Sequence, residues 1–190
     1  MAPDYTRPMP RISQLTTEQA QGEAREIMAA IEKKAGRVTN FVRTIAHRPE
    51  VLKALLPLYS AITGRGTVDA RIKEYVYMKT SMINRCDYCL ASHIASSKRH
   101  GVTEEQVRAL AGDYAASPLF SDAEKLAVRY AEQMTRDANG LSDADFAALK
   151  LHFSEEQIVE ITLVSCMANF TNRLNDALRV PLDEGLSAKI

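Results

Sequence analysis

Apolar side chains recur at helical spacing along most of the chain, and this pattern predicts helices throughout. The clearest stripe lies between Pro49, which favours the start of a helix, and Gly64, which favours its end. It contains Val51, Leu52, Leu55, Leu56, Tyr59 and Ile62. Pro57 lies inside the stripe, so we expect the helix to kink there or to lose a backbone hydrogen bond.

Two further helices are predicted on either side of a short break. The first spans Val68 to Asn84, and its buried side comprises Ile72, Tyr75, Val76 and the stem of Lys79. The second spans Cys86 to His100 and ends at Gly101. No stretch alternates between apolar and polar residues as a half-buried strand would. The pattern therefore predicts an all-α protein.

Capping-box patterns support this prediction, because Ser or Thr followed three residues later by Glu, Gln or Asp favours the first turn of a helix. They occur at Thr16–Gln19, Thr103–Gln106, Ser121–Glu124, Ser142–Asp145 and Ser154–Gln157. Each precedes an apolar pattern of helical period.

We predict that residues 1–190 form one domain. A faint internal repeat is present within it. A shift of 86 residues places Glu74 over Glu160, Cys86 over Asn172, Cys89 over Asn175 and His93 over Arg179. The motif-bearing core then covers about residues 40–110, and a degenerate second copy covers about 121–180. Two amphipathic helices that share a glutamate and a period by chance explain the pattern equally well. If the repeat is real, Asn172, Arg173 and Asn175 serve structure or a subunit contact.

Composition narrows the functional classes. Lys and Arg number 24 and Asp and Glu also 24, so the balanced charge argues against a nucleic-acid partner or an anionic membrane surface. The first residues contain no apolar signal segment, and no apolar run is long enough to span a membrane. We therefore expect a cytoplasmic protein, in which a CxxC pair is typically redox-active or metal-binding.

The segment from Glu74 to His93, EYVYMKTSMINRCDYCLASH, carries the most specific chemistry of the chain. At about 100° per residue, Cys86, Cys89 and His93 fall within roughly 60° of one another on a helix. A tight turn at 84–85 would fold Glu74 back against His93, where a carboxylate orients an imidazole base. Two sulfurs three residues apart in a helical turn are also close enough to form a disulfide.

Several alternatives compete with a redox site. Structural zinc normally requires four ligands, and Cys166, His47, His100 and His152 are scattered along the chain. A thioredoxin-like site would place the CxxC after a strand. The two thiols could also be buried as small apolar groups. We expect Cys166 to lie in the core and these three histidines to be surface or satisfied polar groups, and we expect no metal and no cofactor.

The spacing of Glu74, Cys86, Cys89 and His93 resembles the signature of the alkylhydroperoxidase D-like, carboxymuconolactone decarboxylase superfamily. The upstream run NFVRTIAHRPEVLKALLPLYSAI and the faint repeat resemble it too, strongly over about 40–110 and more weakly to 182. The resemblance implies an all-helical fold, a trimer or hexamer, and a thiol peroxidase site. The best-studied members have a histidine immediately before the second cysteine, whereas this chain has Tyr88, a possible accessory residue.

The resemblance implies that Cys89 is the peroxidatic thiol, Cys86 the resolving thiol, and Glu74 with His93 the proton relay. The helix dipole instead favours Cys86 as the more acidic thiol, since it lies nearer the helix start. We follow the resemblance, because a dedicated base outweighs a dipole effect of roughly 1 kcal/mol.

The sequence thus predicts a thiol-dependent peroxidase that reduces a hydroperoxide through a Cys86–Cys89 disulfide. An external dithiol or thioredoxin-like partner would restore the thiols. The alternatives are a lactone decarboxylase, which needs no CxxC, and a non-enzymatic redox-sensing oligomer. We expect a homo-oligomer, with Asn172, Arg173 and Asn175 offering a polar contact beside the apolar stripes.

Overall fold

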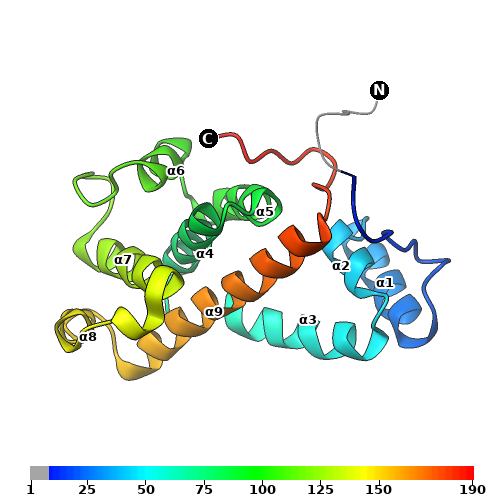
Figure 1. Ribbon diagram of the computed structural model, residues 1–190, viewed down its shortest axis with the longest axis horizontal. Coiled ribbons are helices and arrows are strands. Elements are labelled where there is room, and N and C mark those ends of the chain that lie inside the picture. Colours follow the sequence, from blue (N-terminus) through cyan, green and yellow to red (C-terminus); the bar gives the residue numbers. More distant parts are fainter. Residues whose placement is uncertain (1–8) are drawn as a thin grey trace.

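The computed structural model describes residues 9–190, and over that range the chain forms helices joined by turns, with no strand (Figure 1). The α-helices are α1 (Gly22–Ala35), α2 (Asn40–Ile45), α3 (Pro49–Thr63), α4 (Ala70–Asn84), α5 (Asp87–Ser97), α6 (Glu104–Ala111), α7 (Asp122–Asp137), α8 (Asp143–Lys150) and α9 (Glu155–Leu178). Two short 3₁₀ segments follow α5 and α7, at Lys98–His100 and Ala138–Gly140. The prediction of an all-α fold is confirmed.

Helix α4 is the central element of the fold. Ten consecutive residues, Ile72 to Ser81, are buried, because α5, α7 and α9 all pack against this helix. Val76 and Tyr77 face one apolar cluster, to which α3 and α9 contribute, and Tyr75 and Met78 face a second cluster with α6 and α7. A helix that is surrounded on all sides must satisfy its polar side chains internally, and two of those on α4, Glu74 and Tyr77, belong to the site described below.

Most of the predicted helix boundaries agree with the structure. The helices expected at 49–64, 68–84 and 86–100 are α3, α4 and α5 with its terminal 3₁₀ turn. Four capping boxes begin helices, at Thr103, Ser121, Ser142 and Ser154.

The fifth capping box does not begin a helix. Thr16 and Gln19 exchange the expected hydrogen bonds but close only a turn. The chain bends again at Gly22, which has a φ of 52°, and α1 starts there.

Two polar residues of α4 reach partners on other elements. Lys73 forms an ion pair with Glu160 of α9, and Glu160 also accepts hydrogen bonds from the backbone N–H groups of Thr67 and Val68. Lys79 was expected to bury only its stem, but its ammonium group also lies inside. Its Nζ donates to the Leu110 carbonyl and stands 4.7 Å from the centre of the Tyr114 ring.

The two halves of the predicted repeat differ in form. The first copy is broken into α4 and α5, whereas the second is the uninterrupted helix α9, which crosses the molecule diagonally in Figure 1. Glu160, the counterpart of Glu74, binds Lys73 rather than an imidazole. Within 9–190, no helix is long and apolar enough to cross a membrane.

Candidate functional site

The break between α4 and α5 places the two cysteines at a helix start. Arg85 ends α4 in the left-handed conformation, with φ 60°, and reverses the chain. Cys86 then takes the N-cap position of α5, where its sulfur accepts a hydrogen bond from the backbone N–H of Cys89 at 3.4 Å. The side chain that normally caps a helix with oxygen is here a thiol, so the cap itself belongs to the reactive pair.

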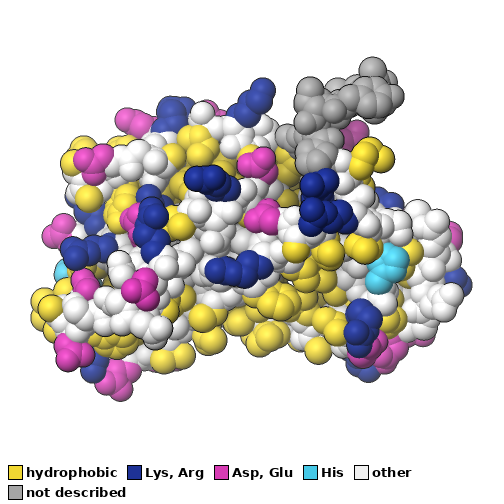
Figure 2. Space-filling model, in the orientation of Figure 1, with side chains coloured by type: hydrophobic (Ala, Val, Ile, Leu, Met, Phe, Trp, Pro, Cys, Tyr) yellow, Lys and Arg dark blue, Asp and Glu magenta, His cyan; other side chains and the backbone are white. Residues whose placement is uncertain are grey.

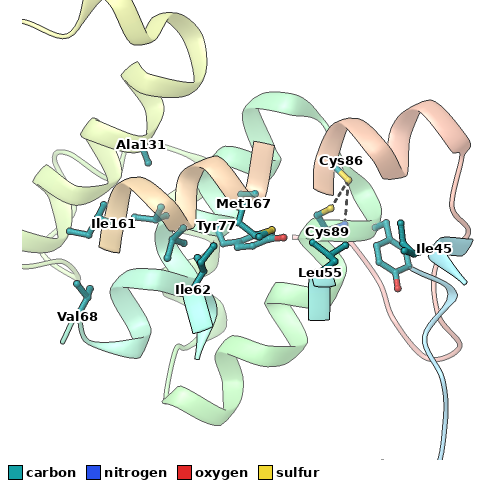
Figure 3. Close-up of a cluster of buried hydrophobic side chains, with 14 of the residues drawn as sticks. Ile45, Leu55, Ile62, Val68, Tyr77, Cys86, Cys89, Ala131, Ile161 and Met167 are labelled. Carbon is teal, nitrogen blue, oxygen red and sulfur yellow. Dashed lines mark hydrogen bonds between the residues drawn. The ribbon is translucent and has the colours of Figure 1, made fainter. Parts of the chain in front are cut away.

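The two sulfurs lie in direct contact inside the protein (Figure 3). The Cys86 thiol donates a hydrogen bond to the Cys89 sulfur at 2.9 Å, and neither residue is bonded in a disulfide. Cys86 is 1% exposed and Cys89 is 3% exposed. Little movement is needed to bring the sulfurs to bonding distance.

The contact separates the acidities of the two thiols. Donation to Cys89, followed by burial, raises the pKa of Cys86. The pKa of Cys89 is lowered, first by the hydrogen bond from Cys86 and then by Asn175, Asn172 and Thr171, although burial acts in the opposite direction. The thiolate is the nucleophilic form, and the lowered pKa favours that form at Cys89 over Cys86.

Helix α9 supplies the remaining contacts to Cys89. Asn175 donates from Nδ2 to the Cys89 sulfur at 3.1 Å, and the Thr171 hydroxyl lies 4.0 Å from it. Asn172 donates to the Ser81 hydroxyl. The sequence prediction that Asn172 and Asn175 offer a polar subunit contact is wrong, because both are buried against α4 and α5. Of the three residues predicted to form that contact, Arg173 alone is exposed.

Glu74 and His93 form the pair that the sequence predicts. His93 Nδ1 lies 2.7 Å from Glu74 Oε2, and Ser96 donates to Glu74 Oε1 at 2.6 Å. Burial pushes the pKa of Glu74 upwards, but the hydrogen bonds from His93 and Ser96 outweigh it, so the pKa is lowered. An ionised Glu74 fixes the proton of His93 on Nδ1 and leaves Nε2 free to accept one.

The acceptor side of His93 faces a phenol. The Tyr59 hydroxyl lies 3.1 Å from His93 Nε2, and the Tyr77 ring stacks on the imidazole with centroids 3.5 Å apart. The Tyr77 hydroxyl lies 2.5 Å from Thr171, which is itself next to Cys89. Among the described residues His93 makes no hydrogen bond to either thiol, and Tyr59, Tyr77, Cys89 and His93 line the same pocket.

Burial raises the pKa of Tyr59 to about 12 and that of Tyr77 well above its usual range. Both phenols therefore stay protonated near neutral pH and can pass a proton only as hydrogen-bonded O–H groups. The sequence analysis placed Tyr59 in an apolar stripe and missed this contact. The only available signal was a tyrosine at a core position, since a buried hydroxyl needs a partner.

A cavity of about 220 Å³ opens onto Cys89. Its walls are mainly aromatic and aliphatic, from Phe41, Val42, Leu56, Tyr59, Tyr77 and Tyr88. Ser92, His93, Thr171 and Asn175 add polar groups. The site thus joins a thiol of lowered pKa, a second thiol and an imidazole–carboxylate pair beside a mainly apolar pocket.

Tyr88 forms part of the pocket wall rather than replacing a base. Its hydroxyl donates to Asp183 Oδ2 at 2.8 Å and accepts from the backbone N–H of Phe41 at 3.2 Å. Burial, with the nearby charge of Asp183, raises its pKa above the usual range. Asp183 also accepts from the backbone N–H of Asn40, so the segment after α9 is fastened to the pocket.

The other cysteine and the histidines lie away from the thiols. Cys166 is exposed on α9, so the prediction that it lies in the core is wrong: it falls on the side of α9 turned away from α4. His47 bonds to the Ser13 carbonyl, and His100 stands 3.9 Å from Glu74 at the edge of the site. In residues 9–190 no group of three or more His, Cys, Asp or Glu side chains is arranged to hold a metal ion.

Comparison with known proteins fits this geometry. Residues 49–133, which include Glu74, both site cysteines and His93, match the model of the carboxymuconolactone decarboxylase family. A crystal structure of a peroxidase-related protein from Ralstonia eutropha JMP134, described as an alkylhydroperoxidase AhpD core, has the same fold. It superposes with a TM-score of 0.83 at 22% identity, covering 94% of this chain and 95% of that one. Residues 49–133 thus resemble the carboxymuconolactone decarboxylase family, and nearly the whole chain has the fold of that AhpD core.

Two further proteins are similar to this chain. The Escherichia coli K12 protein YnjA is 30% identical over 118 residues, which cover 62% of this chain and 64% of YnjA, a little under two thirds of that relative. The debrominase Bmp8, whose crystal structure was also obtained with 2,3,4-tribromopyrrole, superposes with a TM-score of 0.78 at 21% identity and 91% coverage of both chains. Similarity at that identity indicates a common fold and leaves the reaction to the residues of each site.

Proposed function

We propose that this protein is a thiol-dependent peroxidase that reduces a hydroperoxide at Cys89 and stores the oxidation as a Cys86–Cys89 disulfide. The observation that carries the proposal is the contact between the two sulfurs, in which Cys86 donates to a Cys89 of lowered pKa at the wall of a pocket. A thiol of lowered pKa beside a second thiol is the arrangement that a dithiol–disulfide cycle requires.

The reaction follows from the positions of the groups. The Cys89 thiolate attacks one oxygen of the hydroperoxide, the O–O bond breaks, and the alcohol leaves with a proton. Cys89 becomes a sulfenic acid, and the Cys86 sulfur then attacks it to form the disulfide and release water. Asn175 Oδ1 is buried and has no hydrogen-bond partner within 9–190, so it is available to accept the hydroperoxide O–H beside Cys89.

The proton of Cys89 is removed by His93 acting through Tyr59. Glu74 holds the proton of His93 on Nδ1, and Nε2 accepts from the Tyr59 hydroxyl in the pocket. The same hydrogen-bonded groups return a proton to the leaving alcohol, because a group that accepts a proton in one step can donate it in the next.

The proposal includes a partner and an assembly. A dithiol or a thioredoxin-like protein would regenerate the thiols in a reducing cytoplasm. A second copy of this chain would cover the exposed apolar side chains of α9, Val159, Leu163 and Phe170. Hydrophobic side chains gather on this face of the molecule, over α3 and the middle of α9 (Figure 2). Exposed apolar surface of this extent is typical of a protein interface.

The test is consumption of an organic hydroperoxide, such as cumene hydroperoxide, with a panel of dithiols. Cys86→Ser and Cys89→Ser should each abolish turnover, and the matched control Cys166→Ser should leave it unchanged. Mass spectrometry after mild peroxide should find two thiols lost and Cys166 still reduced. Pairing of Cys166 with either site cysteine would contradict the assignment.

The same variants separate the alternative functions. Turnover of a lactone that survives loss of both site cysteines would favour a decarboxylase. A disulfide that changes the assembly without any turnover would favour a redox sensor.

A further inference from the structure

The exposed side chains in the middle of α9 form one narrow stripe. From 157 to 172, four residues of this helix are exposed, and the rest are buried or half-buried in the fold. The four are Val159, Leu163, Cys166 and Phe170. Their successive steps of four, three and four residues are the spacing with which one helix packs along another in a coiled coil. This α9 stripe therefore has the pattern of a surface that receives a second helix.

The α9 stripe is symmetric about its own midpoint. Val159 and Phe170 lie equally far along the helix from the point between residues 164 and 165, and so do Leu163 and Cys166. An antiparallel copy related by a two-fold axis at that point would place Val159 against the partner's Phe170, and Leu163 against the partner's Cys166. A two-fold interface requires self-complementarity of this kind. In a parallel pair, each side chain would instead meet its own equivalent.

The charges that flank the stripe have the same symmetry and opposite signs. Glu156 precedes Val159 by three residues and Arg173 follows Phe170 by three, and both are exposed. Arg173 donates to Asn169, and to no carboxylate within residues 9–190. An antiparallel pair would bring Glu156 to the partner's Arg173 at both ends of the stripe, whereas a parallel pair would oppose like charges. Like charges across an interface disfavour the wrong orientation, so the charges select the antiparallel one.

We propose that two copies of this chain associate through α9, antiparallel, with the two-fold axis passing between residues 164 and 165. The inference rests on the second copy included in the proposed function and is independent of the peroxidase reaction. The apolar face extends from α9 onto the neighbouring α3, where Val51 and Leu58 are exposed (Figure 2). On its opposite side α9 brings Thr171 and Asn175 to the pocket, so the partner lies behind the wall of the site.

The first experiment exchanges the charges. Glu156→Arg and Arg173→Glu should each raise the dissociation constant of the dimer about tenfold at low salt, because like charges then meet at both ends of the stripe. The double variant should return within about threefold of the wild type, since opposite charges face each other again. Sedimentation equilibrium measures these constants. Glu105→Arg, which makes the same charge change on α6, should leave the constant within about twofold.

The outcomes of this exchange are decisive because the substituted side chains are exposed and circular dichroism can verify the fold of each variant. A double variant that associates no better than the two single variants would overturn the antiparallel register. Single variants that associate as well as the wild type would overturn the pairing of Glu156 with Arg173. A monomeric wild-type protein would overturn the second copy itself.

The second experiment traps the register in a Cys166→Ser background. Val159→Cys combined with Phe170→Cys should give a disulfide-linked dimer after mild oxidation, seen by non-reducing electrophoresis. Each substitution alone should give none, because equivalent positions in an antiparallel pair are offset by eleven residues, about 16 Å along the helix. A disulfide requires Cα atoms within about 7 Å. A linked dimer from Val159→Cys alone would show a parallel pair and overturn the proposal.

Hydroperoxide consumption by the same variants separates this inference from the proposed function. The substituted side chains do not line the pocket of Cys89. The expected cross-links in a protein that consumes no hydroperoxide would contradict the peroxidase alone. Turnover in a protein with the parallel cross-link would contradict the antiparallel α9 pair alone.

Discussion

The acidity of Cys89 depends on individual hydrogen bonds from its neighbours. The thiol of Cys86 and the amide of Asn175 both donate to its sulfur. When folding lowers the pKa of a thiol, the folded state is stabilised at pH values above the ordinary thiol pKa. This stabilisation is lost as the pH falls through the pKa of the thiol in the folded state. Removing a donor must therefore raise the pKa and reduce the stability at alkaline pH.

We predict that the alkylation rate of Cys89 follows a pKa below the usual thiol value of about 8.5. Cys86→Ala should raise that pKa, since it removes the largest contribution, and Asn175→Ala should raise it less. Iodoacetamide kinetics across pH, in a Cys166→Ser background, measure this. An unchanged pKa in Cys86→Ala would show that the helix start alone activates Cys89.

The relay of Glu74, His93 and Tyr59 should behave as one unit. Glu74→Gln and His93→Gln should each slow the reaction of Cys89 with hydroperoxide about a hundredfold, and the double variant should cost little more than either. Tyr59→Phe should show a similar loss, because the phenol is the contact between His93 and the pocket. Stopped-flow kinetics measure the rates.

Thr63→Ser is a matched control on the same helix, since serine keeps the hydroxyl that donates to the Tyr59 carbonyl. It should leave the rate unchanged. If the rate losses of the Glu74 and His93 single variants simply added in the double variant, with the fold intact by circular dichroism, the relay would be absent.

At the scale of the helices, Glu160 of α9 fastens the loop before α4. It pairs with Lys73 and accepts from Thr67 and Val68, and a Cβ on Gly66 would stand 1.9 Å from its Oε1 atom. The loop can approach α9 this closely only because residue 66 has no side chain. This contact holds the N-terminal end of α4, and so the position of Glu74.

Gly66→Ala should lower the free energy of unfolding by about 1–3 kcal/mol, the usual cost of forcing extra volume into a packed site. Urea denaturation measures this value. The same substitution in a Glu160→Ala background should cost much less, because the atom that it meets is gone. Equal costs in both backgrounds would rule out the clash as the cause.

The pattern of apolar and capping residues was sufficient to predict helices α3 to α9 but neither the start of α1 nor α2, and the expected turn at 84–85 led to the pairing of Glu74 with His93. Both depend on residues that are close in sequence. The tight turn at Arg85 joins α4 directly to α5, so that Glu74 and His93 meet across two consecutive helices. Asn175, Thr171 and Tyr59 could not be predicted as site residues, since their role depends on how α3 and α9 pack against α5. Cys166 was misplaced for the same reason, because an apolar run does not say which side of α9 faces α4.

At the scale of the whole molecule, the exposed side of α9 has consequences for assembly. Leu163 and Phe170 are 44% and 47% exposed on the longest helix, in a chain of 21.1 kDa. Light scattering at micromolar concentration should give a mass at least twice that of the chain. Leu163→Glu should lower the mass towards that of the monomer, because a buried charge without a partner opposes association.

Leu151→Glu is the matched control for that prediction. Leu151 is 82% exposed and lies in the turn after α8, away from the exposed face of α9. Its substitution should leave the mass unchanged. A monomeric wild-type protein would contradict the prediction of an oligomer.

The ring of Tyr77 stacked on His93 has an optical consequence. The chain contains seven tyrosines and no tryptophan, so tyrosine emission is not masked by a stronger fluorophore. Tyr59, Tyr77 and Tyr88 surround Cys89, and both sulfur and imidazole quench a phenol on contact. We expect the ultraviolet fluorescence to change each time the thiols are oxidised or reduced. The molecule therefore carries its own indicator of redox state, and each half of the cycle can be timed without an added dye.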